Sequence, residues 1–138
     1  MNGTPLRVII VDDSGEVLSA LGRIIDKQPD MELLGVASGV DDGVMLVSQY
    51  QPDVVVLDVN MPDGGGLRAA REMVVVAPGA RLVAFSAFDK TLIRKAMAVA
   101  GVSAYVSKSG DIRELLGAIR AGRDVDALTI RQETFTRR

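Results

Sequence analysis

Acidic, hydroxyl and amine side chains stand at or near the ends of four short apolar segments of the sequence. These side chains are Asp12, Asp13, Asp58, Ser86 and Lys108. The segments are rich in β-branched residues and are bounded by polar ones, which is typical of parallel strands. Because function gathers at the carboxyl ends of the strands in an open parallel sheet, we expect these five side chains to share one cleft.

Three carboxylates in one cleft predict a cation site. Their mutual repulsion raises the cost of ionising all three unless a cation lies between them. Mg²⁺ prefers six oxygen ligands, keeps several waters and uses one or two carboxylates together with phosphate oxygens. We expect Mg²⁺, or Mn²⁺ in its place, with Asp13 and Asp58 as direct ligands and Asp12 acting through water.

A carboxylate in such a cleft can also attack phosphorus. The transition state then needs its equatorial oxygens neutralised by metal, ammonium and hydrogen-bond donors. Lys108 and Ser86 supply the ammonium and the hydroxyl, and the small Ala87 leaves space for a phosphoryl group. The sequence therefore predicts phosphoryl transfer to an aspartate.

Five apolar segments must position these groups, and they recur at intervals of about 21 to 27 residues with helical periodicity between them. The predicted strands are Leu6–Val11, Leu33–Ala37, Val54–Leu57, Arg81–Phe85 and Ser103–Val106. The third is apolar on both faces, as expected of a strand covered by helices on both sides. The economical fold is an α/β (βα)5 three-layer sandwich around a five-stranded parallel sheet.

Length and composition narrow the class of protein. The 138 residues fit one domain, and 16 Lys and Arg against 18 Asp and Glu give a net charge of -2, which disfavours direct nucleic-acid binding. The absence of Cys favours a reducing compartment, and the short apolar run near the N-terminus is too brief for a membrane span, so we expect a cytoplasmic protein. Because the chain has no His, any phosphohistidine donor must be a partner.

Four motifs in this order resemble the CheY-like receiver family of the response regulators in two-component signalling. The motifs are Val8-Ile9-Ile10-Val11-Asp12-Asp13, Asp58-Val59-Asn60-Met61-Pro62 with Gly66-Leu67, Ser86-Ala87, and Tyr105-Val106-Ser107-Lys108. The resemblance implies a flavodoxin-like sheet of strand order 2-1-3-4-5 and a receiver domain over residues 1–122. Residues 123–138 then form a helix extension or linker tail that could lead to an output domain.

The resemblance also implies the role of each site residue. Asp58 would accept a phosphoryl group from a sensor histidine kinase or a small phosphodonor, and Asn60 would bind the metal through its backbone carbonyl. Ser86 would be the switch hydroxyl, Lys108 the cation that binds the phosphoryl group, and Tyr105 the aromatic readout. Such a domain is not an enzyme toward other substrates, since it catalyses only its own phosphorylation and slow dephosphorylation.

The expected output is a change on the face formed by the fourth helix, the fifth strand and the fifth helix. We predict that this face contacts an output domain or target protein, around Ile93, Met97 and Tyr105, and homodimers are a further expectation. The C-terminal motif Lys108-Ser109-Gly110-Asp111 is similar to receivers of the NarL type, which favours transcriptional regulation. No membrane contact is expected.

Two residues depart from the common receiver pattern. Ser109 stands where many receivers have Pro, and because a cis bond before a non-proline residue costs about 2.5–4 kcal/mol, we expect Lys108–Ser109 to be trans. Ser86 replaces the commoner Thr, keeps the hydroxyl and loses one methyl group. The second change should leave switching intact.

Other interpretations compete with these. Asp12 or Asp13 alone would be read as a turn or helix N-cap, Lys108 as a surface lysine and Gly64-Gly65-Gly66 as a flexible loop. An aspartyl phosphatase of the haloacid dehalogenase class is disfavoured, because such enzymes need Asp-x-Asp and this chain has Asn60. A receiver fold kept for phosphorylation-independent docking or dimerisation remains the main alternative.

Overall fold

The computed structural model of the protein describes residues 3–87 and 90–121. Five parallel strands form one sheet in the order β2-β1-β3-β4-β5, which confirms the predicted topology. The strands are β1 (Leu6–Val11), β2 (Met31–Ala37), β3 (Val54–Asp58), β4 (Arg81–Ser86) and β5 (Val102–Ser107). The helices are α1 (Gly15–Asp26), α2 (Val40–Tyr50), α3 (Gly65–Val76), α4 (Thr91–Val99) and a fifth helical run at 112–121.

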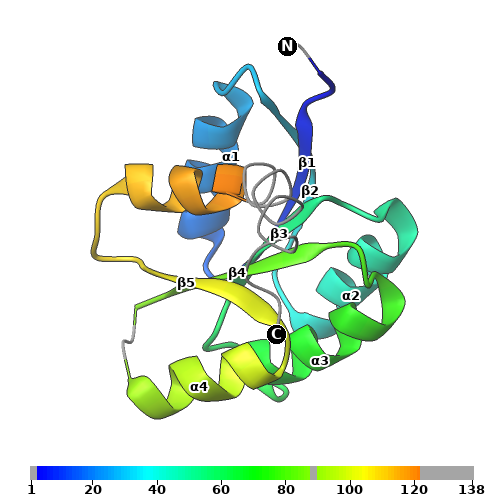
Figure 1. The fold of residues 1–138 in the computed structure, drawn as a ribbon, viewed down its shortest axis with the longest axis vertical. Coiled ribbons are helices and arrows are strands. Elements are labelled where there is room, and N and C mark those ends of the chain that lie inside the picture. The colour runs from blue at the N-terminus through cyan, green and yellow to red at the C-terminus, as the bar shows by residue number, and fades with distance from the viewer. Residues whose placement is uncertain (1–2, 88–89, 122–138) are drawn as a thin grey trace, which may run out of the picture.

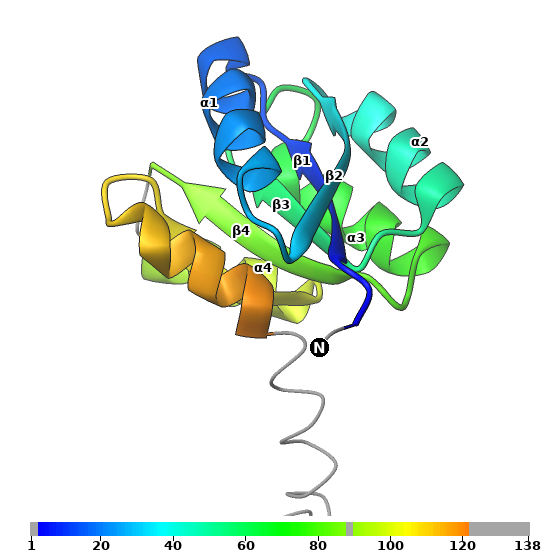
Figure 2. The same cartoon turned by 90° about the horizontal axis from the view of Figure 1, so that it is seen from above.

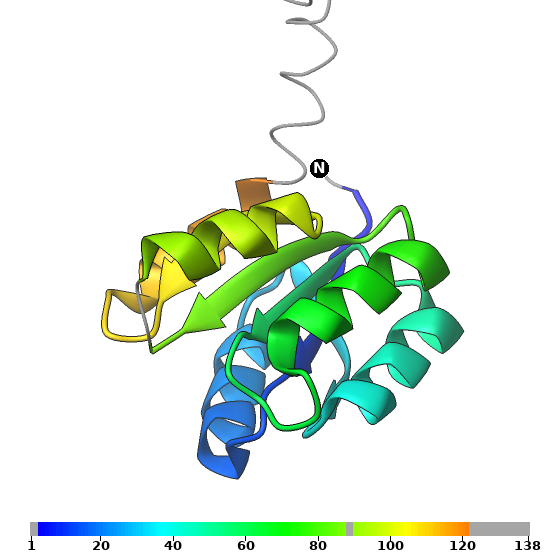
Figure 3. The same ribbon diagram turned by 90° about the horizontal axis from the view of Figure 1, so that it is seen from below.

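The sheet is the middle layer of a three-layer sandwich (Figure 1). Side chains alternate between the two faces of each strand, so Ile10 packs with α1 and the helix at 112–121, whereas Ile9 packs under α2, α3 and α4. Figure 2 shows α1 and the helix at 112–121 on one side of the sheet, and Figure 3 shows α2, α3 and α4 on the other. Every residue of β3 is buried, as the apolar run Val54–Leu57 predicts for its first four residues, and the burial includes the terminal Asp58.

Strand register brings the polar strand ends to one edge of the sheet. Val11 pairs with Leu57, so Asp12 and Asp58 follow directly at neighbouring strand ends. Asp58 itself pairs with Phe85, and Ser86 pairs with Ser107, the residue before Lys108. The predicted shared cleft therefore rests on the pairing of β1, β3, β4 and β5.

The three consecutive glycines do not form the flexible loop that the sequence suggested. Gly65 and Gly66 open α3, and the N–H of Gly66 donates to the carbonyl of Val59 at 2.8 Å. A β-carbon on Gly66 would lie 2.5 Å from the carbonyl oxygen of Asp58, so only glycine lets the helix start so close to the end of β3. The expectation failed because a backbone approach of this kind leaves no periodic signal in the sequence.

The helix α4 is held less firmly than its neighbours. Met97 is its one buried residue, whereas Leu92 and Val99 are 81% and 90% exposed.

Asp41 and Asp42 lie in the first turn of α2, whose N-cap is Gly39. Within the described residues no helix is both long enough and apolar enough to span a membrane. The predicted extension or linker at residues 123–138 lies outside the part of the chain that the structure describes.

Candidate functional site

Three carboxylates meet at the carboxyl edge of the sheet. Oxygen atoms of Asp12, Asp13 and Asp58 lie within 4.8 Å of one another, and Asp12 and Asp58 are only 1% and 3% exposed. Asp13 is exposed and forms the solvent side of the cluster. This arrangement is the predicted acidic cluster, and it offers hard oxygen ligands at one point.

Local hydrogen bonds orient the two buried carboxylates. The N–H of Ser14 donates to Oδ1 of Asp12 at 2.9 Å, and the N–H of Asn60 donates to Oδ1 of Asp58 at 3.2 Å. The N-cap of α1 is Ser14, whose side chain accepts from the N–H of Val17. Asp12 and Asp13 are therefore not the N-cap of this helix, whereas the Ser14 N–H bonded to Asp12 fits the turn that the alternative interpretation also named. Both carboxylates still belong to the cluster.

Lys108 places its ammonium between the two buried carboxylates. Its Nζ lies 2.8 Å from Oδ2 of Asp12 and 3.4 Å from Oδ1 of Asp58. The same atom stands 5.8 Å from the centre of the Phe85 ring, within range of a cation–π contact. The alternative reading of Lys108 as a surface lysine is wrong, because its side chain is only 20% exposed and is paired.

The electrostatics of the site act most strongly on Asp58. Burial raises the pKa of its carboxyl group from 3.8 to about 6, helped by repulsion from Asp12 and opposed by Lys108 and the Asn60 N–H. For Lys108, burial opposes the charge, but the hydrogen bond to Asp12 and attraction by Asp58 outweigh it and raise the pKa. At neutral pH the cluster thus holds an ionised Asp58 that is only weakly stabilised.

Ser86 ends β4 at the same edge of the sheet and is fully buried. Its carbonyl accepts a 2.8 Å bond from the N–H of Lys108, which ties the end of β4 to the loop after β5. Tyr105 lies earlier on β5 and is partly buried, with the guanidinium of Arg94 from α4 at 5.2 Å from its ring centre. The ring therefore contacts α4 through Arg94, and its role as a readout residue stays a prediction.

The Lys108–Ser109 bond is trans, as predicted, and a pair of serines holds the loop that follows it. The hydroxyl of Ser107 lies 2.8 Å from that of Ser109 and accepts the Ser109 N–H at 3.2 Å. These bonds constrain the backbone on both sides of Lys108. Serine spacing alone gave no reason to expect them.

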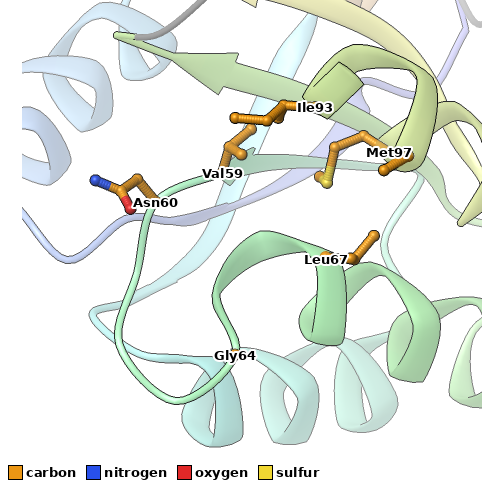
Figure 4. A pocket seen from close by; sticks show the side chains of 7 residues that line it. Val59, Asn60, Gly64, Leu67, Ile93 and Met97 are labelled. Atoms are coloured by element: carbon orange, nitrogen blue, oxygen red, sulfur yellow. The ribbon is translucent and has the colours of Figure 1, made fainter. Parts of the chain in front are cut away.

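A pocket of about 200 Å³ opens beside the acidic cluster, between the β3–α3 loop and α4. Figure 4 shows Val59, Leu67, Ile93 and Met97 around it, with the Asn60 side chain pointing away. Met97 is 1% exposed, so it cannot belong to an exposed partner surface as expected. Ile93 lines the pocket and is partly buried, as is Tyr105, so contact with a partner through this face stays a prediction. Helical spacing placed Ile93 and Met97 on one face of α4 but could not say which face turns outward.

The sequence profile of the response regulator receiver domain matches residues 8–120 of the chain. This span includes β1 from Val8 onward, all of the other strands and the whole acidic cluster. The chain belongs to the response regulator receiver family. The family match does not support the phosphatase alternative.

Several curated relatives of this receiver domain are transcriptional regulatory proteins. The YxjL protein of Bacillus subtilis is 33% identical over 98% of this chain and 65% of its own length. The DesR protein of the same species is 32% identical over 84% of this chain and 57% of its own length. The chain spans only 51% to 65% of the length of these first relatives.

Solved structures agree with the receiver fold. A LuxR-family response regulator from Aurantimonas sp. SI85-9A1 is 30% identical, with a TM-score of 0.81 over 86% of this chain and 84% of that one. The response regulator domain of Thermotoga maritima CheB is 27% identical, with a TM-score of 0.79 over 87% of this chain and 97% of that one. The likeness therefore covers most of the chain.

Several residues near the site of this receiver were missed by sequence reasoning. Phe85 lies under the Lys108 ammonium, Arg94 stacks on Tyr105, and Arg68 contacts the loop that follows β3. Phe85 could have been noticed because it directly precedes Ser86 on a predicted strand. The two arginines gave no signal, since their partners depend on how α3 and α4 are packed.

Proposed function

We propose that this receiver domain is a phosphorylation-dependent switch in which Asp58 takes a phosphoryl group from a sensor histidine kinase or a small phosphodonor. The observation that carries the proposal is the contact of one ammonium, Lys108, with two buried carboxylates, Asp12 and Asp58. The cluster concentrates negative charge on one side and a cation on the other. The oxygens of a phosphoryl group need such a cation, and its phosphorus can be attacked by a carboxylate of the cluster.

The donor set fits a hard divalent cation. Asp13 and Asp58 would bind Mg²⁺ or Mn²⁺ directly, Asp12 would act through water, and Asn60 would contribute its backbone carbonyl. The close approach of three carboxylates, two of them buried, supports this set, because their repulsion favours a cation. When bound, the ion would neutralise charge on the phosphoryl oxygens.

The chain's own residues account for the remaining chemistry. An Asp58 carboxylate oxygen forms the bond to phosphorus, while the bond between phosphorus and the donor atom breaks and its electron pair leaves with the donor. Lys108 binds a phosphoryl oxygen through its ammonium, which requires it to exchange part of its contact with the carboxylates. The main-chain N–H of Asn60, already directed at Asp58, keeps the carboxyl group oriented.

The output follows from the position of Ser86 and Tyr105. Ser86 would donate its hydroxyl to the new phosphoryl group, and Tyr105 would change its contact with Arg94 of α4. The face formed by α4, β5 and the helix at 112–121 would then engage an output domain or target protein. Because the relatives are transcriptional regulatory proteins of greater length, we propose control of transcription through a region beyond a receiver domain of residues 1–122.

Intact-mass spectrometry after incubation with Mg²⁺ and acetyl phosphate tests this function. We expect one added phosphoryl group that requires Mg²⁺ and is lost in Asp58→Asn. Asp53→Asn is the matched control, since that aspartate binds the Arg7 N–H at 2.8 Å in the loop before β3, at the opposite end of the strand. An adduct that survives in Asp58→Asn would refute the assignment of Asp58, and no adduct in any chain would favour the docking or dimerisation alternative.

A further inference from the structure

The loop between β3 and α3 reaches an unusual backbone conformation at its far end. Asp63 has a φ of 61° and Gly64 a φ of 94°, both in the left-handed region. For a residue other than glycine this conformation costs free energy, so Asp63 needs support from its surroundings. The same loop begins with Val59 and Asn60, directly after Asp58.

Arg68 supplies that support from the first turns of α3. Its Nε donates to the carbonyl oxygen of Asp63 at 2.7 Å, and a β-carbon on Gly64 would lie 2.9 Å from Cβ of Arg68. The guanidinium thus contacts the loop where its backbone is least favourable. A planar group with several fixed donors suits this role better than a lysine ammonium.

The other arms of the same guanidinium are held by carboxylates on two helices. Nη1 donates to Glu72 of α3 at 2.7 Å, and Nη2 donates to Asp41 of α2 at 2.8 Å. An exposed ion pair alone contributes little to stability, but two pairs that fix one planar group also fix the direction of its third donor. Arg68 therefore connects the loop to the α2 and α3 layer.

We infer that Arg68 is a positioning residue that sets the divalent-cation affinity of the acidic cluster by holding the β3–α3 loop. This inference rests on the proposed function, because it concerns the loop that carries Asn60. Residues 59–66 are fixed at both ends, by the Asn60 N–H on Asp58 and by the Gly66 N–H on Val59. Arg68 adds a third contact at Asp63, near the far end of the loop, so the backbone at Asn60 is preorganised before a cation arrives.

Mg²⁺ titration calorimetry on wild type, Arg68→Ala and Arg71→Ala tests the inference. Arg71 is an exposed arginine on the same helix, so the control removes the same charge without removing the contact with the loop. We expect Mg²⁺ affinity to fall roughly threefold in Arg68→Ala, the size expected for one charge-assisted hydrogen bond at an exposed site, and to stay unchanged in Arg71→Ala. Asp41→Asn with Glu72→Gln should fall between them, because that variant keeps the bond to Asp63.

Two further readouts separate positioning from general loss of stability. Amide hydrogen exchange should quicken at Gly65 and Gly66 but not in β1, and phosphorylation at saturating Mg²⁺ should reach the wild-type rate. Equal Mg²⁺ affinity in Arg68→Ala and Arg71→Ala would overturn the inference alone. A wild-type chain that binds no Mg²⁺ would overturn both the proposed function and the inference.

Discussion

Lys108 of the loop after β5 and Asp12 at the end of β1 form a 2.8 Å ion pair although two strands, β3 and β4, lie between theirs. Asp58, at the end of β3, is 3.4 Å from the same ammonium. One side chain thus joins the carboxyl ends of strands across the sheet. The Asp12 side chain is only 2% exposed, so water cannot stabilise its charge and the Lys108 ammonium must compensate it.

Replacing Lys108 by Ala should destabilise the metal-free protein by about 3 kcal/mol, because two buried carboxylates lose their cation. Mg²⁺ should restore more stability to this variant than to wild type, since it no longer competes with the ammonium. Urea unfolding followed by circular dichroism measures both quantities. Lys95→Ala, an exposed lysine on α4, is the control and should change neither.

Asp58→Asn should stabilise the metal-free protein at neutral pH. The raised pKa of about 6 means that the unfolded chain ionises Asp58 first, so the native state loses stability as pH rises from 3.8 to 6 and regains none above it. Removing the charge should therefore add about 3 kcal/mol near pH 7.5 but only about 0.5 kcal/mol near pH 4. Urea midpoints at both pH values measure it, and a gain independent of pH would contradict the electrostatic cause.

Mg²⁺ affinity should decrease as pH falls through the pKa of Asp58, because protons and the cation compete for its carboxylate. Between about pH 7 and pH 5 we expect roughly a tenfold loss of affinity. Titration calorimetry in two buffers of different ionisation enthalpy would also report the protons released. The absence of tryptophan makes calorimetry preferable to indole fluorescence. A flat profile would show that Asp58 is not a ligand.

Gly66→Ala should damage the site through the backbone. Its methyl group would approach the Asp58 carbonyl oxygen to 2.5 Å and Cα of Val59 to 2.8 Å, so the start of α3 must move. We expect a loss of about 2 kcal/mol in the free energy of unfolding and a large drop in phosphorylation. Gly117→Ala is the matched contrast: its β-carbon meets nothing within 4 Å, and a gain of about 0.5 kcal/mol is expected.

The serine pair beside Lys108 gives an ordered prediction. Ser107→Ala removes the bond from the Ser109 N–H as well as the contact between the hydroxyls, whereas Ser109→Ala removes only the second. The first variant should lose about 1 kcal/mol of stability and the second close to none. Urea unfolding and the rate of phosphorylation by acetyl phosphate should rank the variants in this order. The reverse ranking would mean that the N–H bond does not hold the loop.

The strands and the acidic cluster were predictable because each chemical group directly follows an apolar run. Parallel pairing then brings Asp12 and Asp58 together without further information. The boundaries were less certain, and β2 begins at Met31, two residues before the predicted start at Leu33. Apolar periodicity fades at such strand ends, where one residue is already exposed.

Contacts between helices and loops were not predictable in the same way. Arg68 binds Asp41, which is 27 residues away in the sequence, and the pairing depends on how α2 packs beside α3. Likewise, the inward direction of Met97 depends on the pocket below α4. Both depend on how the helices pack against one another in the folded protein, and the spacing of residues along the chain does not specify that packing.

Because Met97 is the one residue that α4 buries, lifting this helix from the sheet should expose little apolar surface. We expect α4 to detach in a sub-global opening that costs much less than complete unfolding, and native-state proteolysis should cut there first. A regulatory change in the position of α4 would then cost little free energy. The sandwich could keep its overall fold while one helix changes position.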